Sequence, residues 1–164
     1  MKSLPLDLLT HATKLDMQRN KLKRVTGISI LTHLVELNLS RNKIMESIPE
    51  GIFPHLRKLK FLKLSGNRLT KLPSDINQCA SITYLDLSKN CLQNIQPLVG
   101  LPKLKELFVG KNQLTELPSQ LFKSSSCELI VCKATGNPLR CPPQEVYYLI
   151  FVSFQMATLS NYIT

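Results

Sequence analysis

The chain has 164 residues, 43% of them hydrophobic and none of them tryptophan, which suits one domain with a sizeable core. The net charge is +10, with 21 lysines and arginines against 11 acidic residues. Such a balance favours an acidic partner, although the basic residues are spread along the chain and an equally simple interpretation is a solvated surface.

The cysteine pattern and the N-terminal sequence indicate the cellular compartment of the protein. The five cysteines are an odd number without metal-ligand spacing, and the N-terminal sequence has no long apolar leader. Both features point away from a disulfide-stapled secreted scaffold. We therefore expect a reducing, cytoplasmic environment.

A single template, L-x-x-L-x-L-x-x-N-x-L, recurs along the chain. Its copies cover residues 12–22, 34–44, 59–69, 82–92, 104–114 and 129–139. The template asparagines, spaced 22 to 25 residues apart, are Asn20, Asn42, Asn67, Asn90, Asn112 and Asn137. In each copy the L-x-L segment predicts a short strand whose two leucines point into a shared core. The asparagine amide both donates and accepts, so we expect it to satisfy backbone groups at the turn after the strand.

This pattern resembles the leucine-rich-repeat family, and the resemblance covers about residues 1–143. It implies an α/β solenoid: a right-handed curved horseshoe with short parallel strands on the concave face and helical or irregular convex segments. Residues 69–79 and 114–122 carry the L-x-x-L-P pattern that is common in intracellular members. Residues 22–34 and 92–104 lack it and predict short helical or irregular crossings. The copy through residues 44–59 has room for an extra turn.

The two ends differ from the template. Residues 1–9 match the back half of a repeat without its strand, which predicts either an improvised cap or a piece of a longer array. Residues 136–146, GNPLRCPPQEV, resemble the terminal repeat of intracellular members, in which Cys141 matches the cap cysteine. Residues 144–164 form an apolar segment that has three possible interpretations: a buried capping helix, a non-native end or a membrane tail anchor. The apolar run 146–159 is shorter than the roughly 20 residues of a spanning helix.

No motif for catalysis, metal binding or a cofactor is found, so the sequence predicts a chain that is not an enzyme. His11, His33 and His55 recur at 22-residue intervals, but their different offsets from the template predict solvated turns and not one stacked column. Core positions are expected for Cys79, Cys127 and Cys132, and a turn position for Cys91.

The variable residues beside the strand leucines are the candidate binding site. Phe61 and Tyr84 share one column, and Phe108 lies in the next column one strand further on. Adjacent strands lie about 5 Å apart, so the three rings predict a diagonal apolar patch. Its polar rim would consist of Lys63, Asp86 and Glu106. The alternative is that the rings only stack on one another across the sheet.

A basic row, Arg19, Arg41, Lys89 and Lys111, interrupted by Gly66, lies beside the asparagine turns and could steer an acidic partner. Nucleic acid is disfavoured because no stacking aromatics alternate with these residues. The sequence thus predicts a non-catalytic module that binds a protein partner on the concave face. The resemblance implies a GTPase, a phosphatase or a scaffold component as partner. The alternatives are the repeat portion of a larger signalling enzyme or receptor, and a tail-anchored membrane protein.

Overall fold

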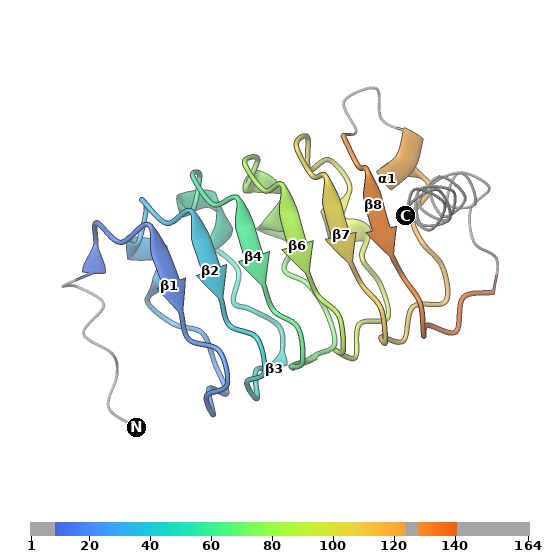
Figure 1. Ribbon diagram of the computed structural model, residues 1–164, viewed down its shortest axis with the longest axis horizontal. Coiled ribbons are helices and arrows are strands. Elements are labelled where there is room, and N and C mark those ends of the chain that lie inside the picture. The colour runs from blue at the N-terminus through green and yellow to red at the C-terminus, as the bar shows by residue number, and fades with distance from the viewer. Residues whose placement is uncertain (1–8, 124–127, 141–164) are drawn as a thin grey trace, which may run out of the picture.

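The computed structural model describes residues 9–123 and 128–140. The predicted N-terminal half-copy up to residue 8, the apolar segment 144–164, Cys127 and Cys141 lie outside the described residues. Within them the chain winds into successive coils, each of which contributes one strand to a parallel six-stranded sheet of order β1-β2-β4-β6-β7-β8 (Figure 1). The strands are β1 (Lys14–Asp16), β2 (Glu36–Asn38), β4 (Phe61–Lys63), β6 (Tyr84–Asp86), β7 (Glu106–Phe108) and β8 (Val131–Lys133).

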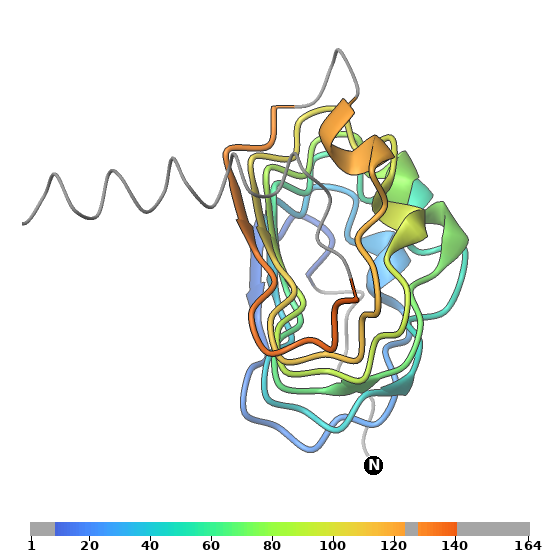
Figure 2. The same ribbon diagram turned by 90° about the vertical axis from the view of Figure 1, so that its right-hand side faces the viewer.

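The opposite side of each coil carries short helices. Seen end-on, the coils stack with the sheet on one side and the helical segments on the other (Figure 2). These segments are η2 (Ile28–Ile30), η3 (Phe53–His55), η4 (Ser74–Gln78), η5 (Gln96–Leu98) and α1 (Gln120–Lys123). They confirm the expected helical or irregular crossings. The sequence did not predict a second, two-stranded parallel sheet that joins β3 (Met45–Glu46) to β5 (Arg68–Leu69).

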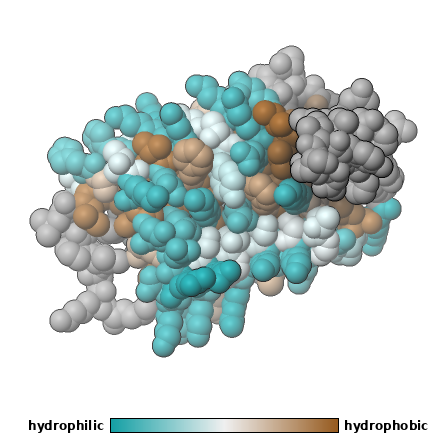
Figure 3. All heavy atoms as spheres, in the orientation of Figure 1, coloured by the Kyte–Doolittle hydropathy of each residue, from teal (hydrophilic) through white to brown (hydrophobic). Residues whose placement is uncertain are grey.

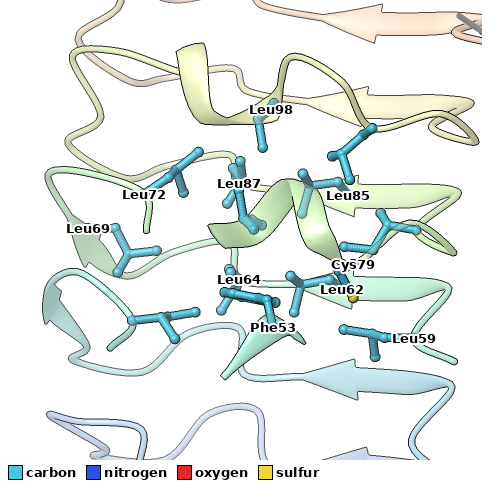
Figure 4. Packing of buried hydrophobic residues seen from close by; sticks show 14 of the residues in the cluster. Phe53, Leu59, Leu62, Leu64, Leu69, Leu72, Cys79, Leu85, Leu87 and Leu98 are labelled. Atoms are coloured by element: carbon cyan, nitrogen blue, oxygen red, sulfur yellow. The ribbon is translucent and has the colours of Figure 1, made fainter. Parts of the chain in front are cut away.

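The core is the space enclosed by the coils, and the template leucines fill it. Leu62, Leu64 and Leu85 are fully buried, as are their equivalents in the neighbouring coils. Figure 4 shows these side chains meeting between the sheet and the back of the coils, with Phe53 of η3 and Cys79 among them. Burying each such leucine contributes about 1.5–3 kcal/mol. No coil could bury these leucines alone, so the coils stabilise one another as an array.

A ladder of buried asparagines ties consecutive coils together, as the template predicts. Asn67 donates from Nδ2 to the carbonyl oxygens of Leu64, 2.9 Å away in its own coil, and Leu39, 3.0 Å away in the preceding coil. Its Oδ1 accepts from the backbone N–H of Ile44 at 3.1 Å. Asn42, Asn90 and Asn112 repeat this arrangement. Asn20, in the first copy, is exposed and donates only within its own turn.

At the back of the solenoid two carboxyl groups join neighbouring coils. Glu50 accepts from the backbone N–H of Ser74 at 2.8 Å, and Asp75 accepts through Oδ2 from the N–H of Gly51 at 2.6 Å. Asp75 is buried, and its Oδ1 has no hydrogen-bond partner among the described residues. Each of these two coils thus provides a carboxylate that accepts a hydrogen bond from the backbone of the other coil.

Candidate functional site

The strand register places the variable residues on the outer face of the six-stranded sheet, called here the sheet face, which the sequence predicts to be concave. Phe61 pairs with Tyr84, and Lys63, Asp86 and Phe108 follow one another on adjacent strands. The residues between them, such as Leu62 and Leu85, point into the core. The predicted columns are therefore confirmed. The sheet face is turned toward the viewer in Figure 3, where apolar patches interrupt a mostly hydrophilic surface.

Three aromatic rings form a continuous ladder across this face. The ring centroids of Phe61 and Tyr84 are 6.3 Å apart, and those of Tyr84 and Phe108 are 5.2 Å apart. Both distances lie in the range of favourable aromatic contacts, and the rings are tilted by 42° and 38° relative to each other. Phe61 keeps 38% of its surface exposed. The rings therefore stack on each other and still present apolar surface to solvent.

Two ammonium groups flank the ladder. Lys63 Nζ lies 5.9 Å from the ring centroid of Tyr84, and Lys133 Nζ lies 5.5 Å from that of Phe108. Both distances fall within the range of cation–π attraction. Lys63 was predicted as rim, whereas Lys133 was not. Its signal was present in the sequence, because it follows Phe108 in the same column on the next strand.

On the N-terminal side the sheet face carries a chain of charges that the sequence analysis did not single out. Lys14 and Lys63 both bind Glu36, with Nζ to Oε distances of 2.9 and 2.8 Å. The hydrogen bond from Lys63, followed by that from Lys14, holds the pKa of Glu36 below its ordinary value. The same bond from Glu36 raises the pKa of Lys63. Lys63 is thereby fixed between the carboxylate and the Tyr84 ring.

The acidic rim residues have different surroundings. Asp86 accepts through Oδ1 from the backbone N–H of Ser88 at 2.9 Å, so it closes the turn after β6 as well as facing outward. Asp16 and Asn38 accept in the same way in their own coils. Glu106 is exposed beside Tyr84. Partial burial, followed by the charge of Asp86, raises the pKa of Tyr84, so its hydroxyl remains a hydrogen-bond donor at neutral pH.

In the structure the basic row lies at the turns that follow the strands. A backbone feature explains which residue types occupy it. Arg41, Lys89 and Lys111 are exposed and have φ of +56°, in the left-handed region. Gly66 and Gly136 occupy the same position with φ of +68° and +78°. A side chain costs about 1–2 kcal/mol there, while glycine costs almost nothing. Gly66, which interrupts the basic row, therefore makes the same left-handed turn without the strain that a side chain causes.

Two sequence-family models match the chain. One, described as leucine rich repeat, matches residues 32–92, and the other, described as leucine rich repeats (2 copies), matches residues 80–123. Together they extend over more than half of the chain. The chain belongs to the leucine-rich-repeat family. The repeats of this family indicate a protein-interaction module.

Solved leucine-rich-repeat structures have the same fold. A leucine-rich-repeat protein of Leptospira interrogans is 32% identical with a TM-score of 0.75, over 82% of this chain and 34% of that one. The ectodomain of the Arabidopsis thaliana receptor kinase GASSHO1/SCHENGEN3 is 28% identical with a TM-score of 0.70, over 85% and 17%. An internalin of Listeria monocytogenes, 20% identical with a TM-score of 0.67 over 79% and 36%, shows the fold alone. The chain thus spans about a third or less of these proteins. No curated protein matches it.

The buried thiols of the leucine-rich-repeat array belong to its core. Burial raises the pKa of the Cys79 thiol to about 12 and that of Cys132 to about 11, so both are neutral core residues, as predicted. Among residues 9–123 and 128–140 no cluster of three or more histidine, cysteine or acidic side chains could hold a metal ion. No helix in these ranges is both long and apolar enough to cross a membrane.

The three histidines do not form one stacked column, as predicted. The rings of His11 and His33 lie 5.7 Å apart and are tilted by 53°, because they occupy the same position of consecutive coils. His55 comes from η3 and does not extend that column. All three are exposed, as predicted.

Proposed function

We propose that this leucine-rich-repeat chain is a non-catalytic module that binds a protein partner on the sheet face, with the aromatic ladder Phe61–Tyr84–Phe108 as the anchor. The contiguous, partly exposed rings are the observation that carries the proposal. Aromatic residues surrounded by polar groups are the usual composition of a binding hot spot. An aromatic ladder needed only for stability could lie as well on the inner face.

The charges around the ladder define the chemistry of the partner. Lys63 and Lys133 hold ammonium groups close to the rings of Tyr84 and Phe108, and Arg41, Lys89 and Lys111 add positive charge along one edge of the sheet. A partner with carboxylates flanking an apolar anchor would complement this arrangement. We therefore propose an acidic protein surface as the ligand, of the kind that a GTPase, a phosphatase or a scaffold component can present, in the cytoplasm.

A solved relative supports the use of this fold for binding. The GASSHO1/SCHENGEN3 ectodomain was solved in complex with CASPARIAN STRIP INTEGRITY FACTOR 2. That finding belongs to the relative, since 17% of its chain is covered by the present one. It supports the general proposal of a protein-binding array and leaves the identity of the partner to experiment.

Quantitative affinity capture tests the proposal. The bait proteins are the wild type, the triple variant Phe61→Ala/Tyr84→Ala/Phe108→Ala and a control, Ile30→Ala/Met45→Ala. The control truncates two apolar side chains, 40% and 50% exposed, that lie in η2 and β3 away from the sheet face. Loss of a hot-spot residue costs about 2 kcal/mol or more, which corresponds to binding roughly thirty-fold weaker.

The expected result is that proteins enriched by the wild type are retained by the control and lost by the triple variant. Circular dichroism must first show that all three baits are folded. Equal recovery of the same partners by the wild type and the triple variant would overturn the assignment to the aromatic ladder.

A further inference from the structure

A second surface lies at the opposite ends of the strands from the basic row, where the chain enters β2 and β4. A hollow of about 310 Å³ opens there between two consecutive coils. Its walls consist of Thr32, His33, Pro54, His55, Arg57 and Lys58. This volume is at the small end of the range for ligand pockets and suits one compact group.

The walls of the hollow are held in a repeated turn. Thr32 and His33 lie between Leu31 and Leu34, and Arg57 and Lys58 lie between Leu56 and Leu59. All four leucines are fully buried. In both copies the second leucine donates its N–H to the carbonyl of the first at 3.0 Å. The side chains around the hollow therefore stand on fixed backbone.

The positive charge of this edge is local and not a general property of the repeat. The third copy makes the same turn, with Ile82 donating to Cys79 at 3.1 Å, but its two outward residues are Ala80 and Ser81. The fourth copy has a single basic residue here, Lys103, whereas basic and imidazole groups gather in the first copies, where the His11 ring also lies 5.7 Å from that of His33. A merely solvated edge would not require two histidines, an arginine and a lysine around one hollow.

No acidic side chain lines the hollow. The ion pairs within the described ranges involve Glu36 and Glu128, and neither reaches Arg57 or Lys58. The guanidinium of Arg57 is oriented by a 3.4 Å bond from Nε to the carbonyl of Pro54, which leaves its two terminal nitrogens free to donate elsewhere. Thr32 Oγ1 and His33 Nδ1 lie 3.4 Å apart and share one hydrogen bond, so the donors that remain on this pair and the His55 imidazole add to those of Arg57 and Lys58.

We infer that this hollow binds a phosphate monoester carried by a protein segment. Such a group has a charge of about −1.5 to −2 at neutral pH and oxygens that accept from guanidinium, ammonium and imidazole donors. Lys58 of the hollow precedes Phe61 by three residues in the chain, so a segment seated on the sheet face can place a phosphorylated side chain in the hollow. The inference rests on the proposed function for the choice of a protein carrier over a lipid headgroup.

The three histidines of the chain are natural reporters for a test by nuclear magnetic resonance. A glycine-flanked phosphoserine pentapeptide and its unphosphorylated twin are titrated into the full chain at constant ionic strength. We expect saturable shifts of the His33 and His55 ring signals with the phosphopeptide alone. Arg57→Gln/Lys58→Gln should weaken the binding at least about ten-fold, whereas Lys103→Gln, an exposed lysine in the equivalent turn two coils further on, should not.

Three outcomes would overturn the inference: no saturable shift at His33 and His55, equal shifts with the serine twin, or equal loss of binding in the Lys103→Gln control. Co-sedimentation with vesicles containing a phosphorylated inositol lipid, without phosphopeptide shifts, would likewise overturn it by assigning the hollow to a membrane. The triple variant of the aromatic ladder should keep the phosphopeptide shifts. Failure of the capture experiment and failure of this site can therefore be told apart.

Discussion

The inner face of the sheet is built mainly from leucines, whereas the residue types of the outer face change at almost every strand. The buried leucines, and the asparagines at the turns after β2, β4, β6 and β7, make nearly identical contacts from copy to copy. The outer face has Glu36, Phe61, Tyr84 and Glu106 at one and the same position of consecutive strands. The inner face therefore determines stability, and under the proposed function the outer face determines recognition, so substitutions on the two faces should have separable effects.

The largest effect is expected from a leucine of the inner face. Leu85→Ala empties a fully buried site between Leu62 and Leu107 and should lower the free energy of unfolding by about 3 kcal/mol. Tyr84→Ala, its neighbour on the sheet face, loses two ring contacts and should cost about 1 kcal/mol. Urea denaturation followed by circular dichroism measures both. Equal losses would break the comparison.

An intermediate effect is expected from the asparagine ladder. Asn90→Ala removes the bonds donated to the carbonyls of Leu64, Leu87 and Ser88 and leaves the N–H of Leu69 without its acceptor, which should cost about 2–3 kcal/mol. Asn20→Ala changes the same template position at an exposed site and should cost less than about 1 kcal/mol. The same denaturation experiment compares the two, and a larger loss at Asn20 would contradict a ladder stabilised by burial.

The smallest effect concerns the turn that carries the basic row. Lys89→Gly relieves a left-handed residue but gives the unfolded chain more freedom, so we expect a gain of only about 0.5 kcal/mol. Gly66→Ala does the reverse at φ +68°, with its new Cβ 3.4 Å from Arg41 Cγ, and should lose about 1 kcal/mol. Thermal unfolding measures both. A clear destabilisation by Lys89→Gly would show that the lysine has a structural role beyond its turn.

The template predicted the sheet well, because the spacing of the repeats and the alternation of inward and outward residues can both be read from the sequence. The strand register, the inward leucines and the bonding of the asparagines were confirmed, and so was the diagonal from Phe61 to Phe108. The left-handed turn was also readable, since Gly66 and Gly136 stand in one column with basic residues. That signal was interpreted as an interruption of a charged row and not as a backbone requirement.

Other features depend on how one coil is rotated over the next, and the template does not encode this. Glu36 pairs with Lys14 in its own column and with Lys63 in the next column, and these contacts depend on where the long side chains reach. The pairing of β3 with β5 depends on the path of the chain after the asparagine turn. The hollow between His33 and His55 depends on the position of η3, because the two histidines occupy different template positions.

The two carboxyl groups at the back of the solenoid have a consequence for acid. Burial, followed by the neighbouring Glu50, raises the pKa of Asp75, while the N–H of Ser74 lowers the pKa of Glu50. A raised pKa means that Asp75 favours folding most at low pH and less as the pH rises through its folded pKa; for Glu50 the sign is opposite. As the pH falls, Asp75 is therefore protonated before Glu50. The proton adds a hydrogen to a pair of carboxyl groups in which Asp75 Oδ1 has no hydrogen-bond partner among the described residues. Mild acid should therefore strengthen the contact between these two coils, and only stronger acid, which protonates Glu50, should weaken it.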